Sequence, residues 1–281
     1  MTFRSDPRRI LLIRTDRLGE TLLNLPVVEQ LRKAFARAEI AWMVNPALVE
    51  LLRGAPGVDR VLGYDGDPAS PWWLRAVRLA GRLREERVDL VMISNCAREF
   101  HAAARLAGIP VRVGYDRKWG FLLTHRIADR RVLGERHEVE YNMQLLAALG
   151  LAVPASVVLQ LPVTKEGERE CTQLLEQLGV KQMDRLIVVH PWTSNPHKQW
   201  PLQRVRELLE RLWRMGVVRV VVVGGPDEGP HAQMLLRGME SEVVNVAGRL
   251  SLPVLAAMLR RARVVITNDS GPMHLAAAVG A

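Results

Sequence analysis

A helix start near the end of the chain gathers residue types that could hold a phosphate. The stretch V-V-I-T-N-D-S-G-P-M-H-L-A-A-A-V-G-A, residues 264–281, predicts a buried strand, a short turn and a helix. Pro272 suits the first turn of that helix, whose free N–H groups and dipole attract anions. The residues expected to line this diphosphate site are Asp269, Ser270, Gly271 and His274. A helix cap by Asp269 or Ser270, with a structural His274, explains the same residues equally well.

A second polar loop, H-P-W-T-S-N-P-H-K-Q-W-P at 190–201, follows a predicted strand at 185–190. Lys198 is a compact point charge suited to one phosphate oxygen, and the chain has only 5 lysines against 34 arginines. Thr193 and Ser194 add hydroxyl donors. Taken alone, however, the loop favours a solvated lysine without a ligand.

Two acidic residues stand where a strand gives way to a helix. Glu228 ends the stretch G-G-P-D-E at 224–228, where an acid commonly holds ribose hydroxyls, while Asp227 could simply cap the helix. Glu20 ends the turn in I-R-T-D-R-L-G-E-T at 13–21. The helix dipole keeps such a carboxylate ionised, and at a cleft between domains it could act as a general base. A helix-capping acid is the alternative.

The chain lacks the motifs of other nucleotide- and metal-binding proteins. No G-x-G-x-x-G follows a predicted strand and no G-x-x-x-x-G-K-[ST] occurs, so a dinucleotide site and a P-loop are not expected. The D-G-D at 65–67 resembles a metal-binding D-x-D, but it stands between a strand and P-A-S-P and is interpreted as a surface turn. No His, Cys or Glu cluster has metal-ligand spacing. We expect neither a metal nor a cofactor.

Composition and charge indicate a cytoplasmic globular protein with a basic first half. The 281 residues are 48% apolar and 25% charged, with no signal peptide and no membrane-spanning run. Cys96 and Cys171 suit free thiols in a reducing compartment. Of the net charge of +9, residues 1–150 carry +6, from 24 Lys/Arg against 18 Asp/Glu. This excess attracts anionic lipid, nucleic acid or a phosphorylated substrate, or serves solubility alone. Scattered arginines and 5% aromatics argue against nucleic acid.

Apolar strands alternate with helical stretches along the whole chain. Strands are expected at 9–14, 39–44, 60–64, 89–94, 111–115, 185–190, 218–225, 243–246 and 264–267. Helices are expected at 22–35, 73–83, 137–150, 165–178, 202–214, 228–239, 251–261 and from 272, with a linker at 151–162. Strands apolar on both faces indicate parallel sheets covered on both sides. The sequence therefore predicts an α/β protein of two doubly wound domains, 1–155 and 156–281, with ligands beyond the carboxyl ends of the strands.

Six blocks, in this order, resemble the ADP-heptose:lipopolysaccharide heptosyltransferase family, inverting enzymes of glycosyltransferase family 9. They are I-L-L-I-R-T-D-R-L-G-E, H-E-V-E-Y-N-M, H-P-W-T-S-N-P-H-K-Q-W-P, G-G-P-D-E, V-A-G-R-L-S-L and N-D-S-G-P-M-H-L-A-A-A. The resemblance implies the GT-B architecture, in which two Rossmann-like domains face a cleft, the first binding the acceptor and the second the nucleotide sugar. It also implies that further residues are missing after Ala281, which would leave the strand at 264–267 as an apolar edge strand.

The resemblance assigns roles to residues of both domains. Glu20 matches the catalytic base, with G-E where the family's commonest pattern is G-D. Lys198 matches the phosphate lysine, Thr193 lies near the phosphate-binding hydroxyls, Glu228 matches the ribose acid, and Leu250 lies where adenine packs. The residues matching the diphosphate and sugar site are Asp269, Ser270, Gly271 and His274. The residues in regions that meet the anionic acceptor are Arg14, Arg17, Arg117 and Lys118.

The implied reaction is a direct displacement without a metal. Glu20 takes the proton of the acceptor hydroxyl as it attacks the anomeric carbon, and domain closure excludes water. Lys198 and the N–H groups at Ser270 and Gly271 stabilise the leaving diphosphate. The implied partners are a nucleotide-sugar donor and an anionic lipopolysaccharide precursor at the inner face of the cytoplasmic membrane, and no nucleic acid. Two alternatives stay open: a nucleotide-sugar-binding protein without transfer activity, and a transferase for another donor such as a UDP-hexose.

Overall fold

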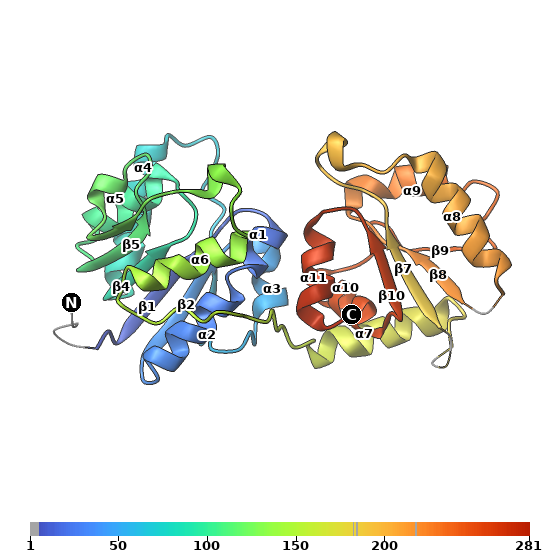
Figure 1. Ribbon diagram of the computed structural model, residues 1–281, viewed down its shortest axis with the longest axis horizontal. Helices are drawn as coiled ribbons and strands as arrows, with labels where there is room; N and C mark the ends of the chain where they lie inside the picture. Colours follow the sequence, from blue (N-terminus) through green and yellow to red (C-terminus); the bar gives the residue numbers. More distant parts are fainter. Residues whose placement is uncertain (1–5, 182, 184, 217) are drawn as a thin grey trace. The chain divides into compact units, whose positions relative to one another are not determined.

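The computed structural model describes residues 6–181, 183, 185–216 and 218–281. They form two compact units, which divide between Gln160 and Leu161. We call these the first unit and the second unit. Figure 1 shows each of them as a sheet with helices on both faces. Each unit buries its own apolar cluster, so each has a core of its own.

Six parallel strands form the sheet of the first unit, in the order β3-β2-β1-β4-β5-β6. Their bounds are Arg9–Ile13 (β1), Glu39–Val44 (β2), Arg60–Gly63 (β3), Leu90–Ile93 (β4), Val111–Tyr115 (β5) and His125–Ile127 (β6). Ile10 of β1 is aligned with Ile40 of β2 and Leu90 of β4. The strand order reverses between β1 and β4. In open α/β sheets ligands bind beyond the carboxyl ends of the strands at such a switch point.

Helices cover both faces of this sheet, because the side chains of each strand point alternately to either side. Leu11 and Ile13 of β1 pack in one cluster with Leu79 of α4 and Phe100 of α5. On the other face α2 and α6 pack together (Figure 1). The helices of the first unit are Leu18–Leu22 (α1), Leu25–Ala34 (α2), Val49–Leu52 (α3), Trp72–Glu85 (α4), Arg98–Leu106 (α5) and Glu138–Ala147 (α6).

The start of α6 gives a structural reason for part of the H-E-V-E-Y-N-M block. The imidazole Nδ1 of His137 accepts from the N–H of Val139 at 3.3 Å, and the carboxylate of Glu140 accepts from the N–H of His137 at 2.9 Å. This reciprocal capping box satisfies two donors of the helix start. Asn142, which is fully buried, donates to the carbonyl of Leu23 at 3.3 Å. The bond from Asn142 fixes α6 against the chain between α1 and α2.

Four parallel strands form the sheet of the second unit, in the order β10-β7-β8-β9. Their bounds are Leu186–His190 (β7), Arg219–Val222 (β8), Val244–Asn245 (β9) and Val264–Thr267 (β10). The switch point of this sheet lies between β7 and β10, which pair with His190 opposite Thr267. β10 forms one edge of the sheet, as expected, and its first residue Val264 is 47% exposed.

Two layers of helices cover the second sheet. Val205 and Leu209 of α8 and Ala232 of α9 pack in one cluster with Val189 and Val222 of the sheet. On the other side α7 packs on α10, and α10 on α11 (Figure 1). The helices of this unit are Lys165–Gln177 (α7), Leu202–Arg214 (α8), Gly229–Leu235 (α9), Leu252–Arg261 (α10) and Gly271–Val279 (α11). Among the described residues, no helix combines the length and apolar character needed to cross a membrane.

The predicted strands are all present, but β6, α3 and α5 were not predicted. The helix expected at 22–35 begins only at Leu25, as α2, and Leu22 is instead the last residue of α1. Pro26 has no N–H to donate to the carbonyl of Leu22, so the helical ladder cannot run through this point. β6 has only three residues, His125–Ile127, too few for an alternating pattern to be visible. β8 ends at Val222, ahead of the paired glycines at 224 and 225.

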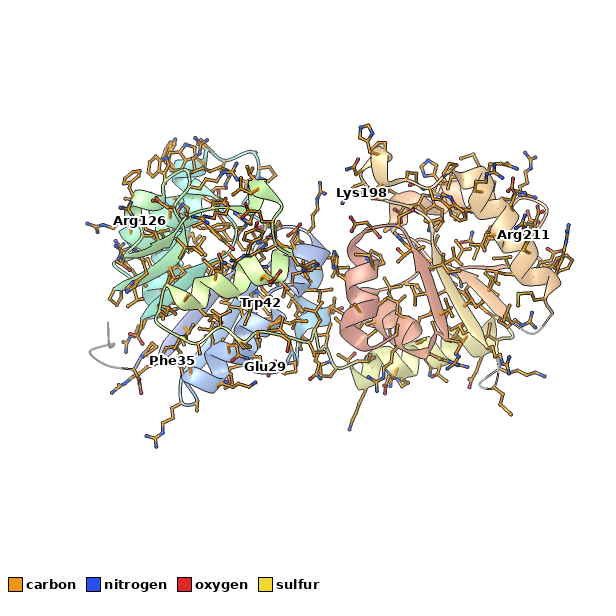
Figure 2. All side chains as sticks on the ribbon, in the orientation of Figure 1. Glu29, Phe35, Trp42, Arg126, Lys198 and Arg211 are labelled. Carbon is orange, nitrogen blue, oxygen red and sulfur yellow. The ribbon has the colours of Figure 1, made fainter. Side chains whose placement is uncertain are left out.

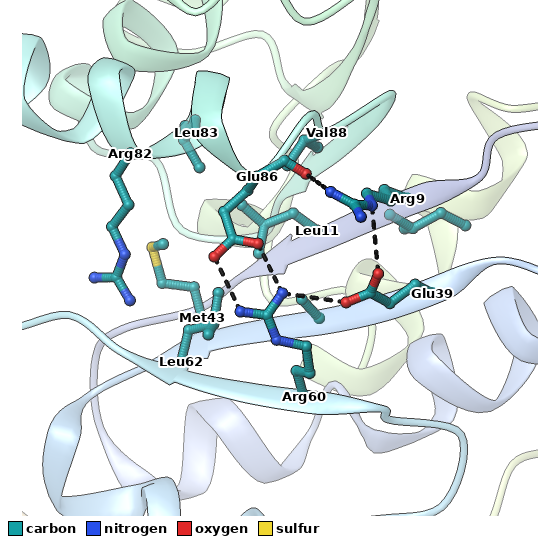
Figure 3. Close-up of a pocket in the computed structure, with 12 residues that line it drawn as sticks. Arg9, Leu11, Glu39, Met43, Arg60, Leu62, Arg82, Leu83, Glu86 and Val88 are labelled. Atoms are coloured by element: carbon teal, nitrogen blue, oxygen red, sulfur yellow. Dashed lines mark hydrogen bonds and ion pairs between the residues drawn. The ribbon is translucent and has the colours of Figure 1, made fainter.

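A small pocket lies at the amino ends of β1, β2 and β3, the edge opposite the switch point (Figure 3). Arg60 forms a two-pronged ion pair with Glu86 at 2.7 and 3.0 Å and also bonds Glu39 at 3.1 Å. Arg9 lies 3.4 Å from Glu39 and donates to the carbonyl of Glu86 at 2.8 Å. Arg9, Glu39, Arg60 and Glu86 thus form one connected group of charges, which ties α4 to three strands and suits a structural role.

Candidate active site

Two loops meet where β7 and β10 end. One is the loop at 191–201, on which Figure 2 labels Lys198, and the other is the turn at 268–270. Asn268 joins them: its amide donates to the carbonyl of Pro191 at 2.6 Å and accepts from the N–H of Trp200 at 3.2 Å. The residues predicted to hold phosphate therefore lie at the switch point of the second sheet, where this type of fold places ligands.

Lys198 is ion-paired in this site. Its ammonium bonds the carboxylate of Asp269, and about half of each side chain is exposed. The hydroxyl of Thr193 donates to the main-chain carbonyl of Asp269 at 3.4 Å, and the N–H of Thr193 donates to Gln199 at 3.1 Å. Two residues of one predicted motif thus contact Asp269 of another. The ammonium of Lys198 is therefore held at the turn at 268–270 by its ion pair.

His190, which the sequence analysis did not select, lies beneath these residues and is 5% exposed. Its Nδ1 lies 3.3 Å from the hydroxyl of Ser270 and 3.5 Å from that of Thr267. Its Nε2 lies 3.5 Å from Oε2 of Glu228. A chain of polar contacts therefore runs from Ser270 through the imidazole to Glu228. The imidazole ring also packs edge-on against Trp192, with centroids 6.0 Å apart.

The carboxylate of Glu228 is fixed by the protein through one of its two oxygens. Its Oε2 accepts from the N–H of Gly225 at 2.7 Å and faces His190. Burial alone would raise the pKa of Glu228, but the contacts with His190 and Gly225 outweigh it and lower that pKa overall. Glu228 is therefore ionised at neutral pH, with one oxygen fixed by the protein. A close approach explains the neighbouring glycine: a Cβ at Gly224 would lie 2.9 Å from Oε2 and 3.0 Å from Trp192.

The remaining predicted donor residues lie around this group. Gly271 opens α11, and the hydroxyl of Ser270 makes no capping bond to that helix but contacts His190 and the carbonyl of Asn268. The simple capping interpretation therefore does not describe Ser270. Leu250 is half-buried, and its segment runs beside the Gly224–Glu228 loop, since Gly248 donates to the carbonyl of Gly224 at 2.9 Å. Ser194 is exposed on its loop, and His274 is half-buried in α11.

A second site lies at the switch point of the first sheet, between β1 and β4. It is an open pocket of about 520 Å³. Its lining includes every residue predicted for catalysis or acceptor binding in the first unit, namely Arg14, Arg17, Glu20, Arg117 and Lys118. Asp16, Asn95, Cys96, Arg131, Val132 and Glu138 complete the lining. Lys118 adopts a left-handed backbone, with φ of 55°, which is uncommon for a residue with a side chain.

Arg14 differs from the other predicted acceptor residues because it is buried, at 3% exposure. Its guanidinium donates to Glu20 at 2.7 Å, to Asp16 at 2.7 Å and to the carbonyl of Ser94 at 3.1 Å. All of its nitrogens are therefore bonded to the protein. Arg14 orients the two acidic side chains at the mouth of the pocket, while Arg17, Arg117 and Lys118 stand exposed around it.

A third acid, Glu138, also faces this arginine. It lies 3.7 Å from Arg14 and 3.5 Å from Arg131. Burial raises the pKa of Glu138, and the charge of Glu20 raises it further. Arg131 in turn bonds Asp129 at 2.8 and 2.9 Å and lies over the ring of Tyr115 at 4.1 Å. The carboxylates of Asp16, Glu20 and Glu138 thus all lie around Arg14, and the pKa of Glu138 is raised.

The structure also bears on the residues set aside by the sequence analysis. Asp67 of the D-G-D accepts from Ala69 at 3.0 Å and Ser70 at 2.6 Å, which confirms a surface turn. Cys96 and Cys171 are both free. Among the described residues, no three His, Cys, Asp or Glu side chains gather as a metal site would require.

The family model of glycosyltransferase family 9 (heptosyltransferase) matches residues 76–281, well over half of the chain. The chain belongs to glycosyltransferase family 9. The family named from the six sequence blocks is therefore confirmed, and the protein is a glycosyltransferase of the heptosyltransferase family.

Two curated relatives of this family 9 protein are named as lipopolysaccharide heptosyltransferases. Lipopolysaccharide heptosyltransferase 3 of Escherichia coli K12 is 25% identical over 273 residues, which cover 93% of this chain and 77% of that protein. Lipopolysaccharide heptosyltransferase 1 of Pseudomonas aeruginosa is 29% identical over 289 residues, which cover 96% and 76%. The alignments thus run through both units.

Solved structures of the family confirm the GT-B fold class, with its two Rossmann-like parallel-sheet domains. A family 9 glycosyltransferase from Veillonella parvula matches with a TM-score of 0.88 at 24% identity, over 97% of this chain and 78% of that one. E. coli ADP-heptose lipopolysaccharide heptosyltransferase II matches with a TM-score of 0.82 at 22% identity, over 96% and 82%. E. coli heptosyltransferase WaaC with ADP-2-deoxy-2-fluoro heptose matches with a TM-score of 0.73 at 23% identity, over 97% and 86%.

Three residues that contact the predicted site residues of this glycosyltransferase were not themselves predicted from the sequence. His190 ends a predicted strand, Asn268 opens the N-D-S-G turn, and Glu138 lies within H-E-V-E-Y-N-M. All three stand inside blocks that were singled out. A polar residue at the last position of an apolar strand was the signal for His190, since such a residue lies under the ligand edge of the sheet.

Proposed function

We propose that this glycosyltransferase moves a heptose, with inversion, from ADP-heptose to the Kdo/heptose inner core of lipopolysaccharide. The observation that carries the donor part is the meeting of Lys198, Asp269, Ser270 and, through His190, Glu228 at one switch point. The names of the relatives support the lipopolysaccharide part. The structure of WaaC with ADP-2-deoxy-2-fluoro heptose supports an ADP-linked sugar.

In the proposed donor complex, the diphosphate replaces Asp269 as the main partner of Lys198. The exposed Lys198–Asp269 pair contributes little by itself, so a more highly charged ligand can displace it. Free N–H groups at the start of α11 and the helix dipole receive the remaining phosphate charge. Glu228 has Oε2 anchored by Gly225 and His190, which leaves Oε1 to accept the ribose hydroxyls. The adenine is assigned to the segment of Leu250.

In the proposed reaction, Glu20 removes the proton from the acceptor hydroxyl. The acceptor oxygen then forms its bond to the anomeric carbon as the bond from that carbon to the diphosphate oxygen breaks, and ADP leaves with the electron pair. Lys198 and the α11 start stabilise the charge that develops on the diphosphate, a role that needs no metal in this scheme. The bond from Arg14 holds the carboxylate of Glu20 in position before the acceptor arrives.

The acceptor is proposed to bind at the open pocket of the first unit. Arg17, Arg117 and Lys118 are exposed there and suit the carboxylates and phosphates of an inner-core precursor. Arg14 was expected among them, but its guanidinium is occupied. We therefore assign Arg14 to positioning Glu20, and acceptor binding to the other three residues.

We also propose that the enzyme acts in the cytoplasm, in peripheral contact with the inner membrane surface. An aromatic cluster lies in the first unit: Trp72 packs on Trp119 at 4.9 Å, and Trp119 on Phe121 at 5.9 Å. Arg98 stacks over Trp72 at 4.7 Å. Trp73 and Phe121 are 55% and 66% exposed. Exposed aromatic rings beside arginines favour an anionic lipid surface, and Trp119 follows directly on Lys118 of the acceptor pocket.

Titration calorimetry with ADP and with UDP, each with and without magnesium, tests the donor assignment. We expect ADP to bind at least about tenfold more tightly than UDP, without dependence on magnesium. A preference for UDP would instead support a transferase for a UDP-hexose, and a requirement for magnesium would contradict the metal-independent scheme. ADP binding without any transfer would support the alternative of a binding protein.

A further inference from the structure

We infer that His190 is a positioning residue of the donor site, which holds Ser270 and Glu228 in register so that diphosphate and ribose binding are energetically coupled. The ligand in this inference, an ADP-linked donor, rests on the proposed function. The juxtaposition itself rests on the structure: one buried imidazole contacts both residues, through opposite ring nitrogens.

A neutral His190 can serve both contacts with a single tautomer. A carboxylate only accepts hydrogen bonds, so Nε2 carries the proton that points to Oε2 of Glu228 at 3.5 Å. Nδ1 is then an acceptor and can receive the hydroxyl proton of Ser270 at 3.3 Å, a proton for which the carbonyl of Asn268 competes at 3.2 Å. When the hydroxyl proton of Ser270 points to the imidazole, the lone pairs of that oxygen point away from the ring. Exchange of that proton toward a phosphate oxygen would release Nδ1 to the neighbouring hydroxyl of Thr267, 3.5 Å away.

The position of His190 in the fold explains why one residue can reach both sides. It is the last residue of β7, the strand between β10 and β8, and those two strands lead into the loops of Ser270 and Glu228. The ring is wedged against Trp192, and Trp192 in turn closes on Gly224. This contact, together with those of the two ring nitrogens, holds the imidazole in its orientation.

Two substitutions of His190 test its contacts with Ser270 and with Glu228 separately. The amide of asparagine occupies the place of Nδ1, so His190→Asn keeps the contact with Ser270 and loses that with Glu228. The amide of glutamine reaches the place of Nε2, so His190→Gln keeps the contact with Glu228 and loses that with Ser270. Each variant is combined with Glu228→Gln and with Ser270→Ala, and ADP affinity is measured by titration calorimetry.

The expected result is a crossed pattern. Glu228→Gln should weaken ADP binding about 10–30-fold in the wild-type and His190→Gln backgrounds but about threefold or less with His190→Asn. Ser270→Ala should weaken binding about threefold to tenfold in the wild-type and His190→Asn backgrounds, and hardly at all with His190→Gln. With ADP-heptose as substrate, both His190 variants should raise KM for the donor more than they lower kcat.

His101→Ala is the control for the loss of a buried histidine. His101 lies in α5 of the first unit, is 1% exposed, and neither ring nitrogen has a hydrogen-bond partner among the described residues. It should change the unfolding transition without changing ADP affinity. The positioning role would be overturned if Glu228→Gln and Ser270→Ala each weakened ADP binding equally in all backgrounds. It would also be overturned if both substitutions lost their effect on ADP binding in the same His190 variant while that variant kept the native circular dichroism spectrum. No ADP binding by the wild type would overturn the proposed donor as well.

Discussion

Arg14 and Glu20 form an ion pair of 2.7 Å in which the arginine side chain is 4% exposed and the glutamate 42%. The buried partner is fixed by Asp16 and by the carbonyl of Ser94, so the glutamate is held by a rigid group and yet reaches the pocket. A general base needs both properties: a defined position and access to the substrate proton. This pair is the structural basis for assigning Glu20 to proton removal.

Glu20→Gln should remove the base and leave the donor site untouched. We expect ADP affinity to stay within about twofold and kcat to fall about 10²- to 10⁴-fold, the range for loss of a general base. Steady-state turnover and calorimetry measure the two quantities. Asp16→Asn is the matched control, since Asp16 bonds the same arginine at the same distance. If Glu20→Gln retains turnover while Asp16→Asn loses it, the base is Asp16.

Arg14→Lys should impair catalysis although it preserves the charge. A lysine cannot bond Glu20, Asp16 and Ser94 together, because it lacks the planar fork of the guanidinium. We expect kcat to fall about 10–100-fold and the free energy of unfolding to fall by about 1–3 kcal/mol. Arg117→Lys, at an exposed site, should instead change mainly KM for the acceptor. A normal kcat for Arg14→Lys would show that Glu20 needs no guanidinium.

Asp129 makes stability depend on pH in a defined direction. The bond from Arg131 lowers the pKa of Asp129 to about 2, below the 3.8 of an isolated aspartate. A carboxyl with a depressed folded pKa stabilises the protein above its unfolded pKa, and this contribution is lost as pH falls toward the folded value. Asp129→Asn should therefore cost about 1–2 kcal/mol near neutral pH.

Urea unfolding of wild type and Asp129→Asn between about pH 7 and pH 2 measures this dependence. The difference between the two proteins should narrow as pH falls below the unfolded pKa. Asp116→Asn is the control, because Asp116 pairs with Arg126 at an exposed surface and at 3.6 Å, and its loss should change stability by less than about 0.5 kcal/mol. A difference for Asp129→Asn that is constant with pH would contradict the assignment.

Trp73→Ser combined with Phe121→Ser should weaken membrane binding. Both side chains are more than half exposed, and burial of such rings in the lipid interface would contribute to binding in proportion to their apolar area. We expect at least about fivefold weaker binding to vesicles of phosphatidylcholine with phosphatidylglycerol in a sedimentation assay. Trp213→Ser, at a 46% exposed tryptophan of the second unit, is the control and should have no effect. Equal vesicle binding by the wild type, the double variant and Trp213→Ser would show that Trp73 and Phe121 do not contribute to membrane binding.

The predictions from sequence were best where apolar patterns are long. The strand at 264–267 and the helix at 202–214 were placed at their observed bounds, because a run of β-branched residues and a long amphipathic repeat are unambiguous signals. β6, at His125–Ile127, is short and mixed in polarity, and it is a strand because β5 offers it an edge to pair with. Such pairing is a tertiary effect that a local pattern does not encode.

The candidate site was predictable as a set of residue types but not as a set of contacts. Lys198 and Glu228 were selected because each follows the end of a strand, where ligands bind in this type of sheet. That Lys198 meets Asp269 follows from how two distant loops pack, which the sequence pattern does not specify. That Arg14 is buried could not be predicted for the same reason: an arginine after a strand can face solvent or be buried by carboxylates. Only the positions of Glu20 and Asp16 decide this.

Transfer itself is the measurement that tests the proposed function most directly. The enzyme is incubated with ADP-heptose and a Kdo-bearing lipid A acceptor, with and without EDTA, and both ADP release and acceptor mass are followed. The account predicts one added heptose with inverted anomeric configuration for each ADP released, at a rate that EDTA does not change. ADP release without a glycosylated acceptor, or turnover of a UDP-hexose but not of ADP-heptose, would contradict it.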